Sequence, residues 1–473
     1  MNFQRKYLQT LRTSPILTAL LIIAPPQIYF LVIQNCFINN SIFIAKYYEV
    51  SLNQIQLLQH IDIISICSFT VYFNSFQQVF GVQTLYLFST WVLCISMILC
   101  TIFNSNFLII IVLRIIQGIS SSFLLVGTTP LIRNLIDIQF IPKAITFSVT
   151  ILSASEIISS LLFPFILQYY GLQYIYLTIS SVSIIHTIYV TLLIAQKITY
   201  NKLEVTNQHI LLFIPLGTTL FISGLTLLNK IQYMLVSLVI IVLGTLSIIV
   251  FIQLYQNSSN NLFSIQYFIK KYSFVFIQFL LSVSIAAEFF QYPIIWRQIF
   301  QLTIIENGIL ISINKIINLA LAQIISKIVK RYQLKCIILC GSSLLLINQV
   351  ISVISLKYYC QIWLIEILHI LSSLYYLQIQ LAIMSHNTLK TQIEHKSIVA
   401  SCLSYFNKLS LSIGMALSLA LQQLAEQIYS KQTEKNNQIG NILHILIFGV
   451  QISYSCCIIF SMLGLFFCLN LEK

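Results

Sequence analysis

The hydrophobic positions of this chain form long unbroken runs rather than an alternating pattern. About fourteen runs of roughly 20 apolar residues are separated by short polar segments. Lipid offers no partner for backbone N–H and C=O groups, so runs of this length predict membrane-spanning helices. The strands of a β-barrel would need only about 10 alternating residues. The predicted spans are 14–34, 61–81, 84–103, 107–128, 144–169, 172–194, 209–228, 233–255, 272–295, 304–326, 335–356, 360–384, 397–424 and 442–469.

Composition supports the same fold class. Hydrophobic residues make up 58% of the 473-residue chain and charged residues only 8%, whereas soluble domains carry about 25% charged residues. We therefore predict an all-α polytopic membrane protein whose first partner is the lipid bilayer. The net charge of +13 is scattered over short loops without a Lys/Arg block, so nucleic acid is not an expected partner. The cysteines show no metal-ligand spacing, and no metal is expected.

The distribution of lysine and arginine predicts the orientation. An even number of spans places both termini on one side, and the side richer in Lys and Arg is cytoplasmic. The loops on the N-terminal side hold Arg5, Lys6, Arg12, Arg133, Lys143, Lys197, Lys202, Lys270, Lys271, Lys327, Lys330, Arg331, Lys335, Lys390 and Lys396. The loops on the other side hold chiefly Lys46, Lys230, Arg297, Lys357, Lys431 and Lys435. Both termini are therefore predicted to be cytoplasmic.

Two further features concern the organisation of the spans. Pro25–Pro26 lies within the first span, where proline removes helix hydrogen bonds and should kink the helix. A weak internal repeat relates the turn at 74–83, after the second span, to the turn at 326–335, after the tenth. Two halves with matching turns are typical of repeat-built transporters.

Ionisable residues inside the spans are the candidate functional residues. Buried charges persist only when they are paired and hydrogen-bonded, or wetted by a cavity. Helical spacing puts each on a polar face, for example Glu288 with Gln291 and Tyr292, and Glu366 with His369. The six residues are three acids and three bases, namely Arg114, Glu156, Glu288, Lys315, Glu366 and Lys408.

Each of these residues has a functional and a structural interpretation. Arg114, with Gln117 on its face, either serves a cavity or forms a structural ion pair, with Glu156 as one candidate partner. Glu288 and Glu366 either bind protons or cations, or form hydrogen bonds between packed helices.

The remaining residues also leave two interpretations open. His369 is either a titrating partner of Glu366, since histidine titrates near neutrality, or a packing residue. Lys315 and Lys408 either anchor an anionic substrate or neutralise Glu156 or Glu288.

The residues around Arg114 resemble a known family signature. Leu113-Arg114-Ile-Ile-Gln117-Gly118 resembles the R-x-x-Q-G motif in span 4 of the major facilitator superfamily, and the order of spans is similar to its fourteen-span drug:proton antiporter branch. The segments that extend the resemblance are 129–133, 142–144, 261–268, 293–298 and 306–308.

This resemblance implies a major-facilitator-type two-bundle fold with about 14 transmembrane helices. The implied parts are a cytoplasmic tail (1–13), an N-terminal six-helix bundle (14–194), a linker with two extra helices (195–271) and a C-terminal six-helix bundle (272–473). Spans 1, 4, 9 and 12 would line a cavity, flanked by spans 2, 5, 10 and 13, while spans 3, 6, 11 and 14 would face lipid. All six buried charges then fall on cavity or flanking helices.

The chain departs from the family at its turns and in span 5. Of the usual G-x-L-x-D-R-x-G-R-R turn only Gly81 survives, while the second-half copy keeps Arg331 and Lys335. The resemblance implies that these turns take part in gating. Of the G-P-x-x-G-G antiporter pattern in span 5, only Pro164 remains.

These observations predict a secondary transporter that works by alternating access. Proton-coupled export of an amphipathic small organic molecule across a bacterial inner membrane is the leading hypothesis. The proton gradient would be the driving force, with no cofactor, and a periplasmic adaptor protein is a conceivable partner. The alternatives are a facilitator or symporter with the same fold, and a non-transporting scaffold. A primary pump is disfavoured because the sequence contains no P-loop, and an enzyme is not expected because it contains no H-x-x-x-x-D pair, no G-x-S-x-G motif and no metal cluster.

Overall fold

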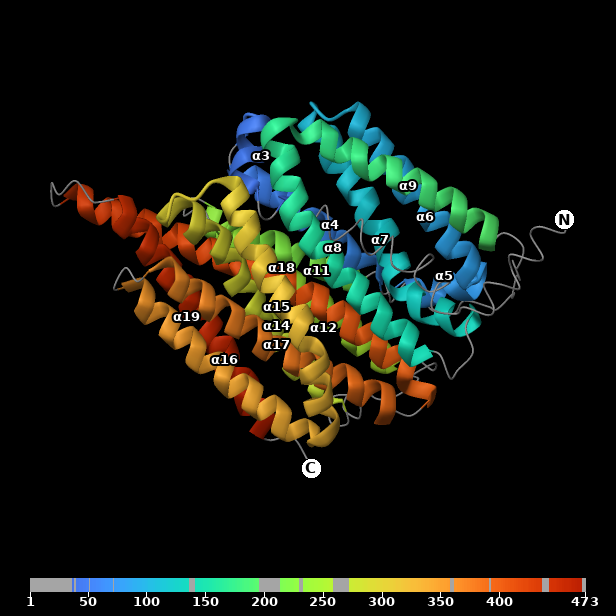
Figure 1. The fold of residues 1–473 in the computed structure, drawn as a ribbon. Coiled ribbons are helices and arrows are strands. Elements are labelled where there is room, and N and C mark those ends of the chain that lie inside the picture. Colours follow the sequence, from blue (N-terminus) through green and yellow to red (C-terminus); the bar gives the residue numbers. More distant parts are fainter. Residues whose placement is uncertain are drawn as a thin grey trace. The chain divides into compact units, whose positions relative to one another are not determined.

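The described part of the chain is built from helices (Figure 1). The computed structural model describes residues 36–37, 40–50, 52–70, 72–135, 141–194, 213–228, 233–257, 272–357, 361–390, 393–435 and 442–469. Within these residues every regular element is helical. The helices are α3 (Ser41–Tyr47), α4 (Leu52–Thr70), α5 (Phe73–Phe80), α6 (Val82–Ile102), α7 (Phe107–Leu135), α8 (Ile141–Tyr169), α9 (Leu172–Ile194), α11 (Phe213–Leu227), α12 (Met234–Asn257), α14 (Ser273–Ile294), the π-helical turn η4 (Ile295–Ile299), α15 (Ile304–Arg331), α16 (Leu334–Lys357), α17 (Ile362–Lys390), α18 (Ile393–Lys435) and α19 (Ile442–Leu469).

The helices confirm the predicted fold class. Among the described residues nine helices are long and apolar enough to cross a membrane, and three shorter apolar helices lie at 61–70, 154–169 and 216–227. Each predicted span other than 14–34 coincides with helical residues. The span at 14–34, together with Pro25–Pro26, lies outside the described residues.

Two predicted spans differ most from the helices of the structure. The span placed at 61–81 is covered by two helices, and the first of them, α4, already begins at Leu52. The helix over 397–424 continues to Lys435. Both extensions are rich in glutamine, which lowers hydropathy but is a good helix former. Hydropathy therefore locates the apolar part of these helices and misses their polar turns.

The chain divides into two compact units, residues 1–208 and 209–473. In the first unit α7 packs against α4 and α6, and α6 packs against α9. These helices surround a core that includes Leu93, Met97 and Leu113. Gly118 permits the close approach of α7 to α4, because a Cβ at this position would lie 2.5 Å from the backbone oxygen of Asp62.

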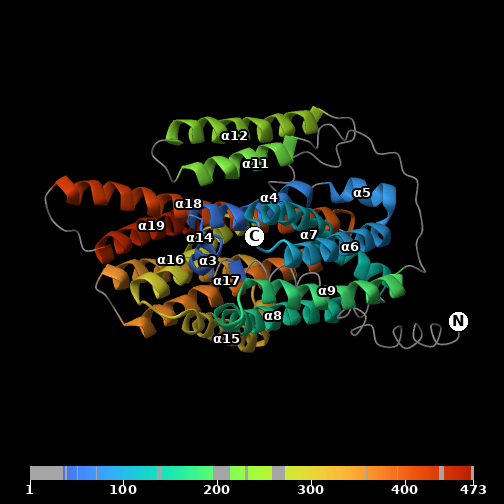
Figure 2. The same ribbon diagram turned by 90° about the horizontal axis from the view of Figure 1, so that it is seen from above.

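In the second unit α14 is central and packs against α17, α18 and α19 (Figure 2). Gly414 of α18 allows this, since a Cβ there would lie 2.5 Å from the backbone oxygen of Val283. Helix α15 begins at a capping box in which Thr303 and Glu306 satisfy each other's backbone N–H groups. It then packs against α17, which also contacts α16.

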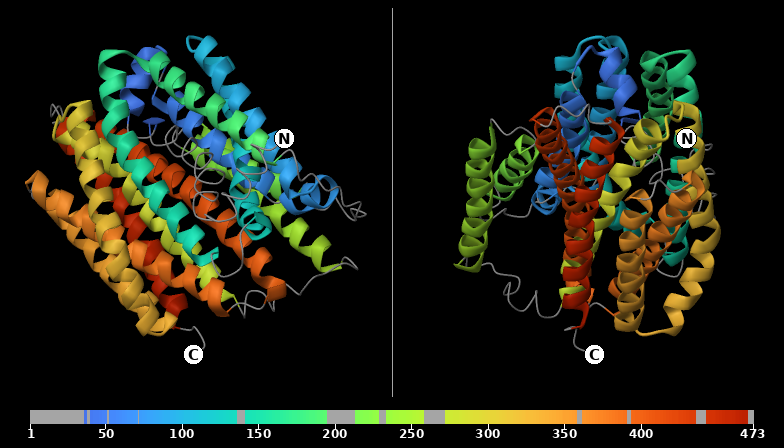
Figure 3. Two further views of the ribbon diagram at one scale, coloured as in Figure 1. Left: turned by 45° about the vertical axis from the view of Figure 1, so that its right-hand side comes forward. Right: turned by 90° about the vertical axis from the view of Figure 1, so that its left-hand side faces the viewer.

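The two extra helices, α11 and α12, belong to the second unit and form a tight pair (Figure 3). A Cβ on Gly244 would lie 2.6 Å from the backbone nitrogen of Phe221, and Ser237 donates to the Gly224 carbonyl at 2.6 Å. Small residues that bring backbones close are the usual contacts of membrane helices. Helix α11 also contacts α18, while α12 exposes apolar side chains such as Leu235 (77% exposed).

Candidate functional site

An ion pair is buried among the described residues of the first unit. The Arg114 guanidinium on α7 lies 3.4 Å from an Asp62 carboxylate oxygen on α4, and both side chains are 2% exposed. The Phe37 ring covers the pair, with its centroid 4.1 Å from Arg114 Cζ. Arg114 is thus balanced by an acid and shielded by an aromatic face.

Asp62 was missed by sequence reasoning, and the proposed pairing of Arg114 with Glu156 was wrong. Asp62 stood at the edge of the expected 61–81 span, but α4 begins at Leu52, which places Asp62 about three turns inside the helix. Glu156 lies half-buried on α8, whereas the ion pair of Arg114 is with Asp62 on α4. The predicted set of three buried acids and three buried bases therefore omitted one buried acid, Asp62.

The rest of the R-x-x-Q-G segment packs α7 against its neighbours. Gln117 is buried and its Nε2 lies 3.2 Å from Cys100 Sγ and 3.5 Å from Met97 Sδ on α6. Gly118 sits directly against the backbone of Asp62. The motif thus places Arg114 beside its acid by fixing α7 on two sides.

In the second unit Glu288 lies at the centre of a hydrogen-bond network. Its side chain on α14 is fully buried and accepts hydrogen bonds from Tyr292 Oη (2.8 Å), Gln349 Nε2 (2.8 Å) and Ser372 Oγ (2.5 Å). These donors come from α14, α16 and α17. Three hydrogen bonds satisfy an acidic side chain that would otherwise be very costly to bury.

The network extends to helices that were expected to face lipid. Gln349 on α16 also donates to Ser284 Oγ at 2.9 Å and accepts from Ser461 on α19 at 2.8 Å. The outer faces of the same helices are apolar, with Ile347 55% and Ile459 56% exposed. Spans 11 and 14 therefore have a lipid-compatible face and a polar inner face, and Glu288 points into the interior of its own bundle.

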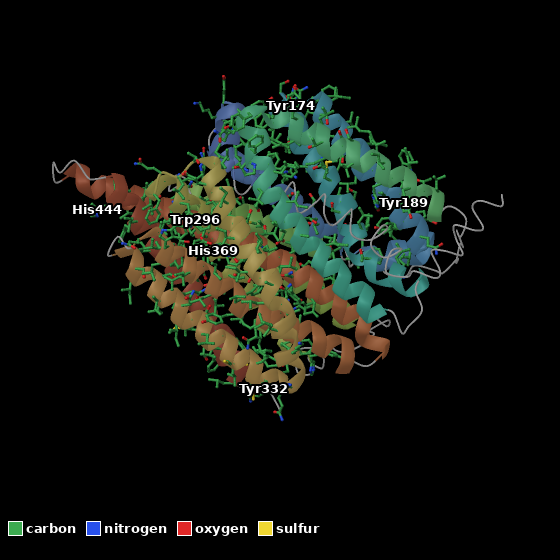
Figure 4. The ribbon with its side chains drawn as sticks, in the orientation of Figure 1. Tyr174, Tyr189, Trp296, Tyr332, His369 and His444 are labelled. Atoms are coloured by element: carbon green, nitrogen blue, oxygen red, sulfur yellow. The ribbon has the colours of Figure 1, made fainter. Side chains whose placement is uncertain are left out.

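A second titratable pair lies beside this network. His369 Nδ1 on α17 is 3.7 Å from Glu366 Oε2, and both residues are buried. The imidazole packs against the Tyr292 ring, with centroids 3.8 Å apart and planes tilted by 35°. The Trp296 ring centroid lies 5.2 Å from the imidazole (Figure 4). Tyr292 therefore contacts Glu288 through its hydroxyl and His369 through its ring.

Asn314 on α15 fixes the protonation pattern of this imidazole. Its Nδ2 lies 2.9 Å from His369 Nε2, while its Oδ1 accepts from Ser373 Oγ (2.7 Å) and Asn318 Nδ2 (2.8 Å). With Oδ1 engaged, Nδ2 donates to Nε2, so the ring hydrogen is assigned to Nδ1 and faces Glu366. The arrangement describes a neutral histidine.

The two lysines of the predicted set are half-buried. Lys315 lies next to Asn314 on α15, with its Nζ 6.0 Å from the centroid of the Phe289 ring. Lys408 lies on α18. The structure thus gathers Glu288, Glu366, His369 and Lys315 around the aromatic residues of α14, whereas Arg114 and Gln117 belong to the first unit.

The predicted gating turns have defined geometry. Gly81 joins α5 to α6 with φ +77°, a conformation that favours glycine. Arg331 is exposed at the end of α15, and Lys335 Nζ donates to the Leu469 carbonyl at 3.0 Å. That contact places a cation at the C-terminus of α19, where it complements the helix dipole.

Comparison with known proteins identifies the family. The family model described as Major Facilitator Superfamily matches residues 28–419. The chain belongs to the major facilitator superfamily. It is therefore a multi-pass membrane protein and a secondary transporter of this kind. No curated protein has a sequence that matches the chain.

Solved structures share the fold over nearly the full length of this family member. A POT family transporter in complex with 5-aminolevulinic acid has 13% sequence identity and a TM-score of 0.69, covering 97% of this chain and 96% of its own. An auto-inhibited POT family peptide transporter has 11% identity and a TM-score of 0.66, covering 97% of both chains. A D-xylose-proton symporter has 11% identity and a TM-score of 0.59, covering 97% and 98%. At these identities the likeness shows the fold alone.

Proposed function

We propose that this transporter moves an amphipathic small organic molecule in exchange for protons, and that the buried Glu366–His369 pair is the proton site. The observation that carries this proposal is the contrast between two buried pairs of the described residues, Arg114–Asp62 and Glu366–His369. Arg114 keeps its proton at every relevant pH, so its pair with Asp62 is permanently charged. Both Glu366 and His369 can gain and lose a proton.

Burial makes the occupancy of this pair depend on access to water. The Glu366 oxygens accept no hydrogen bond from the described residues, and the titratable side chain beside them is His369, whose Nδ1 lies 3.7 Å from Oε2. An uncompensated buried carboxylate costs several kcal/mol. The proton occupancy of the pair is therefore proposed to differ between this enclosed state and a state in which the bundle opens to water. Alternating access converts this difference into coupled transport.

Substrate contacts are proposed for the half-buried cations. Lys315, above the Phe289 ring, is the proposed partner of an anionic group, and Lys408 is a second candidate. Glu156, also half-buried, is the candidate in the first unit. On the Lys/Arg bias we also propose that both termini are cytoplasmic and that the protein resides in a bacterial inner membrane. A periplasmic adaptor stays a prediction.

The test uses purified protein in proteoliposomes with ethidium as the probe and a pH-sensitive dye in the lumen. With the lumen acidic, the wild type should accumulate ethidium while the lumen becomes alkaline. Glu366→Gln and His369→Gln should abolish gradient-driven accumulation. Ile367→Ala is the matched control, because Ile367 lies between them on α17 but is 53% exposed. Ethidium movement that ignores the pH gradient would contradict the proposal.

Symport is the second candidate. It is favoured by the loss of the glycine-rich span-5 pattern, of which α8 retains only Pro164. It also fits the shared fold, since one solved relative is titled a D-xylose-proton symporter and another binds 5-aminolevulinic acid. In the same vesicles with an acidic exterior, accumulation of 5-aminolevulinic acid together with lumen acidification would support symport and exclude exchange.

A further inference from the structure

The two units repeat one another at a constant spacing in the sequence. Helices α4 and α15 begin at Leu52 and Ile304, 252 residues apart, and α6 and α16 begin at Val82 and Leu334, again 252 apart. The turns at 74–83 and 326–335 have the same spacing. Helices α7 and α17 begin 255 residues apart, at Phe107 and Ile362, because α16 has 24 residues and α6 has 21.

This spacing maps the buried pair of the first unit onto the second. Asp62 corresponds to Asn314 and Phe37 to Phe289, both 252 residues on, and Arg114 corresponds to His369, 255 residues on. The contacts agree with this correspondence. In the first unit Arg114 Nη1 lies 3.4 Å from Asp62 Oδ2, and Arg114 Cζ lies 4.1 Å from the centroid of the Phe37 ring. In the second unit His369 Nε2 lies 2.9 Å from Asn314 Nδ2, and the ring centroids of His369 and Phe289 are 5.2 Å apart.

The neighbouring positions agree. Gly118, which abuts the Asp62 backbone, corresponds to Ser373, which donates to Asn314 Oδ1 at 2.7 Å. What differs is the charge. The fixed cation is replaced by an imidazole and the acid of α4 by an amide, while Glu366 introduces an acid where the first unit has Ile111.

We infer that the second unit holds a counterpart of the fixed ion pair in the first unit, and that the charge of this counterpart changes with protonation. Asn314 is the positioning residue, and the orientation of its amide follows the protonation state of His369. This inference rests on the proposed function and assigns its proton to a particular atom. In the neutral state Asn314 Nδ2 donates to His369 Nε2. A proton taken from water onto Nε2 turns that nitrogen into a donor, so Asn314 must present Oδ1 instead.

The amide rotation has consequences on α15. Asn318 donates to Asn314 Oδ1 in the neutral state, so it must rotate as well, and Ser373 contacts both amides. Protonation of an α17 residue is thereby transmitted to two positions one turn apart on α15. The charged imidazole then faces Glu366 through Nδ1 and an amide oxygen through Nε2, as Arg114 faces Asp62.

Several other ionisable groups surround the imidazole and belong to the same equilibrium. Tyr292 packs against it from α14, and Lys315 follows Asn314 on α15. Glu288 and Tyr454 lie one contact further, each against Tyr292. Ionisable groups from α14, α15 and α17 therefore surround the proposed proton site.

The test reads His369 directly. Histidine labelled with ¹⁵N in lipid nanodiscs gives the protonation state of the ring, and loss of the signal in His369→Gln assigns it. Asn314→Asp restores the acid of the first unit and should move half-protonation of His369 to higher pH by about one unit or more. Asn348→Asp is the control, because Asn348 is buried on α16 and donates to Ser372 rather than to His369. A smaller effect is expected from it. An unchanged titration in Asn314→Asp would overturn the inference.

A second readout separates this inference from the proposed function. In proteoliposomes Asn314→Asp combined with His369→Arg rebuilds the fixed pair. It should abolish proton-driven ethidium accumulation while preserving ethidium exchange between the two sides. If this variant remains fully driven by protons, the inference is wrong. If the wild type moves no ethidium but His369 titrates and responds to Asn314→Asp, the inference holds and the proposed function fails.

Discussion

Replacing Asp62 by asparagine should strongly destabilise the first unit. The substitution keeps the shape of the side chain but leaves the Arg114 charge, 2% exposed, without its counter-ion. The described residues offer no hydrogen bond to Arg114 Nε or Nη2, and Phe37 covers the group rather than neutralising it. The guanidinium cannot escape by losing its proton.

The distance sets the size of the effect. At 3.4 Å and an effective dielectric constant of about 20, the two charges attract each other by about 5 kcal/mol. Breaking one side of a buried pair usually costs about 3–5 kcal/mol, whereas replacing both partners costs much less. Asp62→Asn should therefore lower the free energy of unfolding by about 3–5 kcal/mol. The double variant with Arg114→Gln should lose much less than the sum of the two single losses.

The assay is unfolding by SDS in mixed micelles, followed by circular dichroism, for the wild type, both single variants and the double variant. Glu49→Gln supplies the matched control, because Glu49 is an exposed acid of the same unit and its loss should change the free energy by less than about 0.5 kcal/mol. Single losses that simply add in the double variant, or a loss below about 1 kcal/mol for Asp62→Asn, would refute the reasoning.

Three further predictions concern packing and the second network. Gly118→Leu should destabilise the protein by about 1–3 kcal/mol or more in the same assay, because its Cβ would meet the Asp62 backbone at 2.5 Å; an unchanged transition would show that α7 can shift freely. Glu288→Leu should cost about 1–3 kcal/mol for each donor left unpaired, and Glu288→Gln should cost less, so equal losses would argue against the hydrogen-bond network. Gly244→Leu should separate α12 from α11, where the Cβ would lie 2.6 Å from the Phe221 nitrogen, and should raise proteolysis between these helices; unchanged cleavage would contradict tight packing.

The number and class of the helices follow from hydropathy because lipid imposes one requirement on every span. The helix ends do not follow, as the early start of α4 and the long α18 show. The error at α4 affected the candidate site, because Asp62 lay at the predicted end of a span and was not counted among the buried charges. A rule that tests helix propensity beyond the apolar run would have found it, since the residues before Asp62 are mostly leucine, glutamine and isoleucine.

The candidate site was predictable only where its residues share one helix. Glu366 with His369, and Glu288 with Tyr292, lie one turn apart, and the structure brings both pairs together. Their partners on other helices are the neutral residues Gln349, Ser372 and Asn314. The sequence criterion was a buried charge, so it did not select neutral residues. Sequence spacing sets the face of a helix, but it does not state which neighbour that face meets.

The most direct measurement of the central claim is proton flux through Glu366→Gln and the wild type in the same proteoliposome preparation. With ethidium as the probe, the wild type should alkalinise an acidic lumen as the dye accumulates, and Glu366→Gln should do neither while Ile367→Ala behaves as the wild type. Wild-type rates of proton movement in Glu366→Gln would contradict the claim that the buried pair on α17 carries the proton.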